Sequence, residues 1–267
     1  MASTIASHAE AHHEAVLGPQ SATAIDGSAF VAVQLFTKRS DSSAAPQETS
    51  LLVSGGIKPV VGLPLSLSIT LPMSMSSGER TRVGLENVIL SGRWRFELES
   101  LQRTFGKEDN FILLISGLEL PTGSMDQAFG RAPMNFLWGL MSSVEWSTWS
   151  AMGFALTRIE GENGEGIRKG HELLSGAGLA LTPLETERLM ISGQFGVSYE
   201  VGLATHSPDE TTSGDYQRIM VTPATVIGIG RRVQLLGYGA IPASQHVSRA
   251  EDRNLWRAGL GVAYFLD

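Results

Sequence analysis

The chain contains no cysteine and comparatively few charged residues. Of its 267 residues, 42% are hydrophobic and 18% are charged, whereas typical soluble domains carry roughly 25% charged residues. The absence of cysteine excludes thiol catalysis, disulfide bridges and thiolate metal sites, and it suits an envelope protein that passes unfolded through an oxidising compartment. The net charge of −7 argues against a nucleic-acid partner.

The chain also lacks an obvious targeting segment. Residues 1–17 have neither a basic start nor a continuous apolar core, so they do not resemble a secretory signal, and we expect a processed or engineered chain with an added Met1. Residues 132–157 are long enough to cross a bilayer as a helix. However, their serines, Glu145 and the central Trp146 and Trp149 favour a hairpin with aromatic residues at its turn.

The clearest positive signal is strand-like alternation. The segment "GLPLSLSITLPMS", residues 62–74, places apolar side chains at odd positions and serine, threonine or proline at even positions. Successive side chains of a strand point to opposite faces, so this segment presents one apolar face and one hydroxyl-lined face. In a soluble sheet the apolar face would pack in the core, whereas in a membrane barrel it would meet lipid and the serines would line the lumen.

Twelve such segments can be placed along the chain. They are residues 29–38, 48–58, 62–74, 86–98, 110–120, 132–144, 148–158, 171–182, 188–202, 215–228, 232–243 and 254–266. Most exceed the about 5–6 residues of common globular strands and approach the about 9–11 residues of a tilted membrane-spanning strand. Connections after the second, sixth, eighth and tenth segments are short, and the others are longer and polar. This asymmetry is typical of outer-membrane barrels, although the long connection after the fourth segment departs from it.

The last segment, "NLWRAGLGVAYFLD", resembles the C-terminal strand of bacterial outer-membrane proteins, in which alternating apolar residues end at an aromatic residue. Here Leu266 takes the position of the aromatic, and Phe265 is out of phase. We therefore predict an all-β fold, a transmembrane antiparallel up-and-down β-barrel of about 12 strands, formed by residues 28–267 after a tail or plug of residues 1–27. A barrel of this size predicts a narrow pore or a plugged lumen.

Five local motifs, taken together, resemble one protein family. They are "GLELPTG" (117–123), "VGLENVILSGRWRF" (83–96), "LSLSITLP" (65–72), "LTPLETERLMISGQFG" (181–196) and "GYGAIPASQ" (237–245). Over about residues 28–266 the chain resembles the outer-membrane β-barrel family associated with the MetA pathway of phenol degradation, whose members are also described as transporters. The resemblance implies a role in moving hydrophobic or aromatic compounds and brings no catalytic or binding residues with it.

The N-terminal segment is rich in histidine. His8 and His12 are four residues apart, which would place them on one face of a helix, and His13 adjoins them. Two imidazoles at this spacing can chelate Zn²⁺ or Cu²⁺. A solvated tail is the simpler interpretation, because a metal site normally needs a third ligand and supporting hydrogen bonds. We expect no cofactor, with Zn²⁺ or Cu²⁺ at this tail as the single candidate.

Polar residues in the inward-facing register are the candidate lumen lining. They are Gln34, Ser66, Ser68, Thr70, Arg93, Arg95, Glu97, Asn135, Gln194 and Glu200. Arg93, Arg95 and Glu97 share one face of the fourth segment, where they would form a charged constriction that sets selectivity. Alternatively, the interior charges pair with one another and stabilise the barrel. The sequence leaves both interpretations open.

Enzymatic interpretations have little support. His171 and Glu172 beside Ser175 are the nearest approach to a catalytic relay, but the chain lacks the glycine-flanked serine motif of hydrolases. The acidic loop 160–165 lacks the oxygen spacing of a calcium loop, which favours an ordinary solvated loop. We therefore do not expect an enzyme.

The function predicted from the sequence is a channel or transporter in the outer membrane of a Gram-negative envelope, for small and hydrophobic or aromatic solutes. Its partners would be outer-membrane lipid and lipopolysaccharide together with the solute, and no nucleic acid. The main alternative is a structural barrel without transport, whose histidine-rich N-terminus contacts a periplasmic partner or a metal ion. A surface hydrolase is a third alternative.

Overall fold

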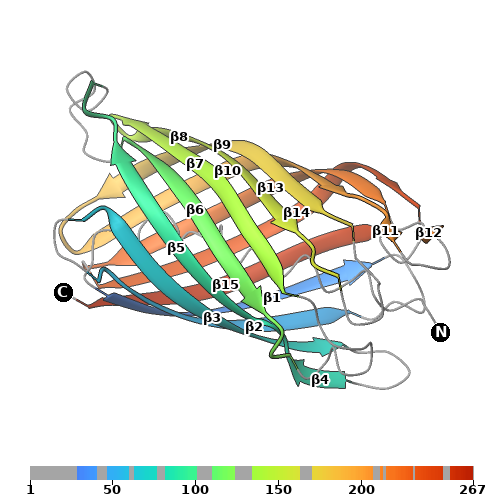
Figure 1. Cartoon of the computed structure of the whole chain (residues 1–267). Helices are drawn as coiled ribbons and strands as arrows, with labels where there is room; N and C mark the ends of the chain where they lie inside the picture. The colour runs from blue at the N-terminus through green and yellow to red at the C-terminus, as the bar shows by residue number, and fades with distance from the viewer. Residues whose placement is uncertain are drawn as a thin grey trace.

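A computed structural model describes residues 29–40, 47–59, 63–76, 82–100, 110–123, 134–162, 170–206, 211–212, 215–230, 232–248 and 253–266. The chain is all-β, and twelve long tilted strands form a barrel (Figure 1). These strands are β1 (Ala29–Ser40), β2 (Glu48–Ile57), β3 (Leu65–Ser76), β5 (Val88–Glu97), β6 (Phe111–Leu120), β7 (Asn135–Trp146), β8 (Trp149–Ile159), β9 (Glu172–Glu185), β10 (Leu189–Gly202), β13 (Tyr216–Ile229), β14 (Val233–Val247) and β15 (Asn254–Leu266). The short strands are β4 (Arg82–Leu85), β11 (Thr205–His206) and β12 (Thr211–Thr212).

Each barrel strand pairs in antiparallel fashion with the next barrel strand along the chain. The first and last strands also pair, in a continuous register from Ala29 opposite Leu266 to Arg39 opposite Trp256, and this pairing closes the barrel. The predicted antiparallel up-and-down barrel of about 12 strands is therefore confirmed. Closure removes the open edges that a flat sheet would expose.

The two ends of the barrel differ in their connections. At one end, which we call the short-turn end, β7–β8, β9–β10 and β13–β14 are joined by two or three residues, and β15 finishes there. The opposite end, which we call the loop end, carries the connections β1–β2, β6–β7, β8–β9, β10–β13 and β14–β15. Two connections at the short-turn end are longer. The connection between β5 and β6, residues 98–110, is long as the sequence predicts, whereas the connection between β2 and β3, residues 58–64, is longer than the short one that the sequence predicts.

Residues 135–159 form a hairpin, as expected from the two tryptophans. Trp146 of β7 lies opposite Trp149 of β8, and Ser147 in the two-residue turn has a positive φ of 54°. Two-residue hairpin turns need positive φ angles because their twist must match that of the strands. In the described part of the chain, no helix is long and apolar enough to cross a membrane.

The wall is interrupted at the start of the fourth predicted segment, residues 86–98. This segment forms β5, and the short strand β4 precedes it; Glu86 and Asn87 lie between β4 and β5 with both side chains buried. Adjacent residues of a regular strand point to opposite faces, so both can be buried inside only if the strand bulges. The Glu86 backbone N–H still donates to the Pro72 carbonyl at 2.9 Å, which keeps this part of the wall joined to β3.

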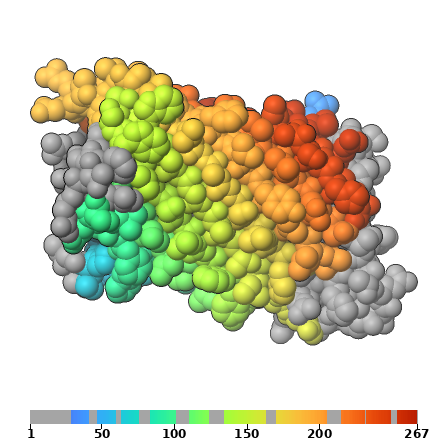
Figure 2. All heavy atoms as spheres, turned by 90° about the horizontal axis from the view of Figure 1, so that it is seen from above, coloured from blue at the N-terminus to red at the C-terminus, as the bar shows by residue number. Residues whose placement is uncertain are grey.

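The apolar face of the alternating strands points outward. On β3, Leu67 is 44% exposed, whereas its neighbour Ser66 is 5% exposed. Large exposed apolar side chains occur on each barrel strand, from Val31 of β1 to Leu260 of β15. Figure 2 shows the wall from β7 to β14 as a continuous convex surface. Such an extended apolar exterior is far larger than the patches that water-soluble monomers tolerate, and it is typical of a wall in contact with lipid.

Inward-facing aromatic rings lie over glycines on neighbouring strands. The cross-strand pairs are Phe30 with Gly56, Phe154 with Gly176, Tyr216 with Gly202 and Tyr238 with Gly259. In each pair, a Cβ added to the glycine would come within 3 Å of the ring. The missing side chain therefore lets the ring lie flat against the wall instead of crossing the lumen.

We expect Leu67→Arg to destabilise the barrel in lipid by about 2–4 kcal/mol, because it places a charge on the lipid-facing wall. The measurement is urea-dependent unfolding in lipid vesicles, followed by the heat-modifiable shift of the folded band on a gel. Leu67→Met is the matched control and should cost less than about 1.5 kcal/mol. Equal stability of the Arg and Met variants would contradict a lipid-facing position.

We expect Gly259→Ala to cost about 1–3 kcal/mol, because its Cβ would lie 2.2 Å from the Tyr238 ring. The same unfolding assay measures the loss. In a Tyr238→Ala background the substitution should cost almost nothing, since the obstructing ring is gone. Gly193→Ala is the control, because no atom lies within 4 Å of the added Cβ.

Candidate functional site

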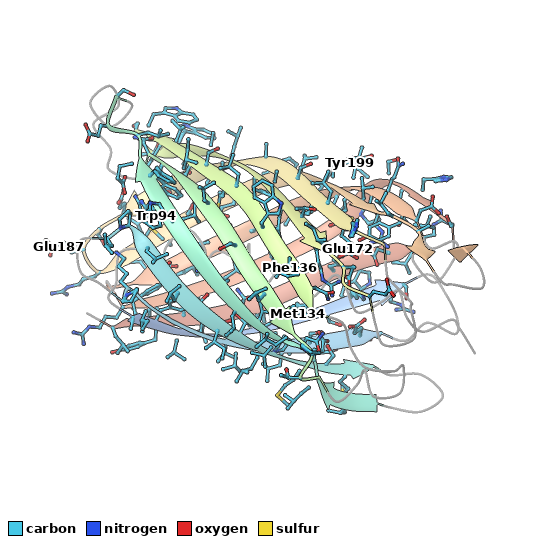
Figure 3. All side chains as sticks on the ribbon, viewed as in Figure 1. Trp94, Met134, Phe136, Glu172, Glu187 and Tyr199 are labelled. Atoms are coloured by element: carbon cyan, nitrogen blue, oxygen red, sulfur yellow. The ribbon has the colours of Figure 1, made fainter. Side chains whose placement is uncertain are left out.

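Most charged and polar side chains inside the barrel gather near the loop end. They form what we call the loop-end belt, and the residues are Lys38, Glu48, Ser74, Glu86, Asn87, Glu119, Asn135, Arg158, Glu160, Glu172, Glu200, Tyr216, Arg218, Asn254 and Arg257. All except Lys38, which is half-buried, are buried. Glu172 lies toward this end in Figure 3, and the exposed Glu187 lies at the short-turn end.

Arg158 of β8 is the centre of one half of the belt. Its Nε donates to Glu119 Oε2 at 3.0 Å and its Nη2 donates to Glu119 Oε1 at 3.1 Å. Its Nη1 lies 2.5 Å from Glu160 Oε1 and 3.6 Å from Glu172 Oε2. One buried guanidinium therefore holds carboxylates from β6, from β9 and from the residue that follows β8. Its planar fork suits such multiple carboxylate contacts better than a lysine would.

Glu200 of β10 is the centre of the other half. It accepts two hydrogen bonds from Arg257, at 2.8 and 2.7 Å, and lies 3.6 Å from Arg218 Nη1. With its amide oriented to satisfy these donors, the Asn254 oxygen accepts from both arginines. The two halves meet at Tyr216, whose hydroxyl donates to Glu172 at 3.3 Å and whose ring lies 4.1 Å beneath the Arg218 guanidinium.

The belt continues around the rest of the circumference. Asn87 donates to Glu119 at 3.0 Å, and the Ser74 hydroxyl contacts Glu86. Lys38 of β1 pairs with Glu48 at 3.2 Å and lies opposite Arg257 in the β1–β15 register. In the described part of the belt, glutamates outnumber the basic residues, so the loop-end mouth is acidic.

The middle of the lumen has two unlike walls. On β1 to β8, large side chains form an apolar cluster of Phe36, Leu52, Ile89, Phe111, Leu113, Ile115, Leu137, Met141 and Leu156, all buried. On β10 and β13, the inward positions carry Gln194, Gly196, Ser198, Thr222 and Ala224, which we call the small-residue wall. Every residue of this wall is half-buried rather than buried. The small-residue wall is therefore an accessible part of the lumen.

Hydroxyl groups join the strands at the edge of the apolar cluster. Ser50 bonds to Ser74 at 2.7 Å, Ser54 bonds to Thr70 at 2.9 Å, and Ser68 bonds to Ser91 at 2.6 Å. These pairs satisfy each other across β2, β3 and β5, so the hydroxyl-lined face expected from the sequence lies inside and is largely self-paired.

Closer to the short-turn end, β5 contributes three charged residues. Arg95 Nε lies 2.6 Å from Glu97 Oε1, and its guanidinium lies 4.3 Å over the Phe111 ring. The Glu97 side chain is 45% exposed, at the mouth of the barrel. Arg93 is 4% exposed, and its Nε and Nη1 have no hydrogen-bond partner among the described residues.

The ten residues proposed to line the lumen lie at several depths. Gln34, Ser66, Ser68 and Thr70 belong to the hydroxyl-rich side of the wall, and Gln194 belongs to the small-residue wall. Asn135 and Glu200 belong to the loop-end belt, whereas Arg93, Arg95 and Glu97 lie near the short-turn end. In the register on β6, Asn135 lies opposite Glu119 and Arg95 lies opposite Leu113, six residues and thus about 20 Å apart along the strand. The ten residues therefore lie at different depths, and a constriction formed by Arg93, Arg95 and Glu97 stays a prediction.

Sequence reasoning missed most of the belt. Four of its charged residues lie at inward-facing positions near the loop ends of their strands, namely Glu119, Arg158, Arg218 and Arg257. Their position in the strand alternation, on the face opposite the apolar residues, was the signal in the sequence that could have identified them. Glu160, expected in a solvated loop, is buried against Arg158, because its carboxylate continues the inward face of β8 past the end of the strand.

The residues of the candidate catalytic relay do not lie together in the structure. Glu172 points into the lumen, and Ser175, three positions further along β9, lies on the opposite face. His171 Nδ1 accepts a hydrogen bond from the Glu160 backbone N–H at 3.1 Å, so these residues do not gather into a relay.

The candidate metal ligands His8, His12 and His13 lie outside the described residues. Within the described ranges, no group of three residues could hold a metal ion.

Comparisons with known proteins show the fold. No family model matches the chain, and no curated protein matches it, so membership of the phenol-degradation family stays a prediction. The chain is similar to an outer membrane channel from Pseudomonas putida F1, with a TM-score of 0.69 and 11% identity over 90% of this chain and 96% of that chain.

Two autotransporter domains share the barrel less closely. The translocator domain of NalP from Neisseria meningitidis has a TM-score of 0.53 and 12% identity over 89% of this chain and 88% of that chain. The β domain of the Bordetella autotransporter BrkA has a TM-score of 0.53 and 13% identity over 89% of this chain and 99% of that chain. The chain thus has a barrel fold of the outer-membrane type.

We expect Arg158→Gln to destabilise the barrel by about 3–5 kcal/mol, because it leaves Glu119, Glu160 and Glu172 buried without their shared cation. Denaturant unfolding in detergent micelles, read from the heat-modifiable gel shift, measures the loss. The control is Glu187→Gln in the exposed β9–β10 turn, which should stay within about 0.5 kcal/mol of the wild type. A matching result for the two variants would show that the belt does not stabilise the fold.

Proposed function

We propose that this protein is a passive outer-membrane channel for small solutes, including hydrophobic or aromatic ones. Two features support a membrane setting. The exterior of each barrel strand carries exposed apolar side chains, and the charged side chains of the described strands gather inside the barrel or at its ends. This distribution is the reverse of that in a soluble barrel, whose apolar side chains face the interior.

The proposed orientation follows from the connections. Outer-membrane barrels turn tightly on the periplasmic side and carry their longer loops on the cell surface. The short-turn end, where β15 finishes, would therefore face the periplasm, and the loop-end belt would face outward. Trp94 and Trp149, exposed near the short-turn end, would then lie at the inner interface of the membrane, where aromatic side chains are favoured.

The observation that carries the transport proposal is the contrast between the two inner walls. Leu52, Leu113 and Leu156 on one side are at most 1% exposed, so no water column touches them. The small-residue wall opposite is partly accessible along its length. A solute would therefore move along β10 and β13, past side chains that impose little steric barrier. The paired charges of the belt hold the outer mouth in shape.

This proposal is tested by single-channel recording in planar bilayers. The wild type should conduct ions, and Ser198→Trp should roughly halve or abolish the conductance, because an indole would fill the space along the small-residue wall. Val197→Trp is the matched control, since the neighbouring residue faces outward, where tryptophan is tolerated. Equal conductance of the two variants would show that the path lies elsewhere.

Two results would overturn the proposal itself. The first is the absence of any conductance, both for the full chain and after deletion of residues 1–27, from preparations that show the heat-modifiable gel shift of a closed barrel. The second is a protein that stays monomeric and soluble without detergent, since its apolar exterior would then not contact lipid.

A further inference from the structure

Among the inward-facing arginines whose side chains the structure describes, Arg93 is the one that has no carboxylate beside it. Arg95 contacts Glu97, Arg158 contacts Glu119, and Arg218 and Arg257 share Glu200. Arg93 is nevertheless as buried as these residues, with 4% of its surface exposed. Its Nε and Nη1 are buried donors without a hydrogen-bond partner in the described part of the barrel.

An isolated guanidinium in this position needs a counter-charge. Burying an unpaired charge is costly, and arginine does not escape the cost by losing its proton. Among the described residues, no carboxylate pairs with Arg93, and the nearest one on the same strand, Glu97, is already bonded to Arg95. We therefore expect the charge of Arg93 to be balanced by an anionic group that enters the lumen.

The neighbours of Arg93 define what that group would be. Ser66 lies opposite Arg93 on β3 and offers a hydroxyl donor, while Ile115 lies opposite on β6 with Leu113 beside it. One uncompensated positive charge favours a monoanion over a dianion. The apolar wall favours a weakly hydrated organic anion over a small, strongly hydrated ion. A carboxylate also matches the planar donors of a guanidinium.

We propose that Arg93, with Ser66, binds the carboxylate of organic monoanions inside the lumen. This inference rests on the proposed channel function and specifies its solute class: small carboxylic acids with an apolar body. The site would lie on the β3–β5 side of the lumen, two residues deeper than Arg95 along β5. Because Arg93 and Ser66 are buried there, a solute on the path along β10 and β13 would reach the guanidinium through a movement of the Arg93 side chain. A bound anion would neutralise the charge that the barrel leaves unpaired.

The test is isothermal titration of the detergent-solubilised full-length protein with three compounds of similar shape, namely benzoate, benzyl alcohol and benzylammonium, at constant ionic strength. Benzoate should bind, and the neutral and cationic compounds should bind at least about 10-fold more weakly, because only the carboxylate forms charge-assisted hydrogen bonds. This comparison uses the wild type alone and does not depend on the folding of a variant.

Two variants assign the effect to Arg93. Arg93→Gln should weaken benzoate binding by about 10-fold or more. Arg95→Gln removes a charge from the same face of the same strand, but one already balanced by Glu97, and should bind benzoate within about 3-fold of the wild type. Benzoate should also raise the temperature of the heat-modifiable gel shift for the wild type and for Arg95→Gln, but not for Arg93→Gln.

Equal binding of benzoate and benzyl alcohol, or equal loss of binding in the two variants, would overturn the inference. Binding of chloride as tight as that of benzoate would overturn the carboxylate preference. The two proposals fail separately: a conducting barrel that does not bind benzoate refutes only the anion site. A barrel that binds benzoate at Arg93 and does not conduct refutes only the channel.

Discussion

The structure depends on the pairing of β1 with β15. In a bilayer, backbone N–H and C=O groups have no water to bond to, so a sheet can cross only if its first and last strands bond to each other. Here the register between them is unbroken from Ala29 to Arg39, and the chain returns to the short-turn end to complete it. Once this contact closes the ring, each of the twelve strands has two neighbours and one face directed outward.

Once the barrel is closed, the side chains of each strand point alternately to the lipid and to the lumen. Outward positions become predominantly apolar, and inward positions collect the charged, hydroxyl and small side chains together with one apolar cluster. Side chains confined to the interior must then satisfy one another. They do so by charge pairing in the loop-end belt, by hydroxyl pairs on β2, β3 and β5, and by aromatic rings lying over glycines. The bulge at Glu86 and Asn87 shows the same demand overriding strand regularity, since both side chains turn inward to reach partners.

Much of the barrel could be predicted from the sequence because each strand is recognised from the alternation of residues close together in the chain. Alternation within a few residues placed all twelve strands, with boundaries such as 29–38 for β1 and 254–266 for β15 close to those observed. The interior networks could not be predicted in this way. Glu119 and Arg158 are 39 residues apart and Glu200 and Arg257 are 57 apart, so their contacts depend on the register of several strands. Phe265 does not fall on the apolar, outward face of the last strand. It packs inside the barrel near Phe30, a contact that exists only because β1 and β15 pair.

The interior charges are distributed unevenly along the barrel, and this bears on selectivity. The loop-end belt holds most of them, with glutamates in excess, and its arginines are fixed in position by bonds to these glutamates. A solute passing the belt would meet arginines that are already paired with carboxylates. Near the short-turn end the charges are fewer, but Arg93 is uncompensated. Because an unpaired charge in a poorly hydrated setting attracts an ion more strongly than a paired one, discrimination between solutes would arise at Arg93 rather than where charges are most numerous.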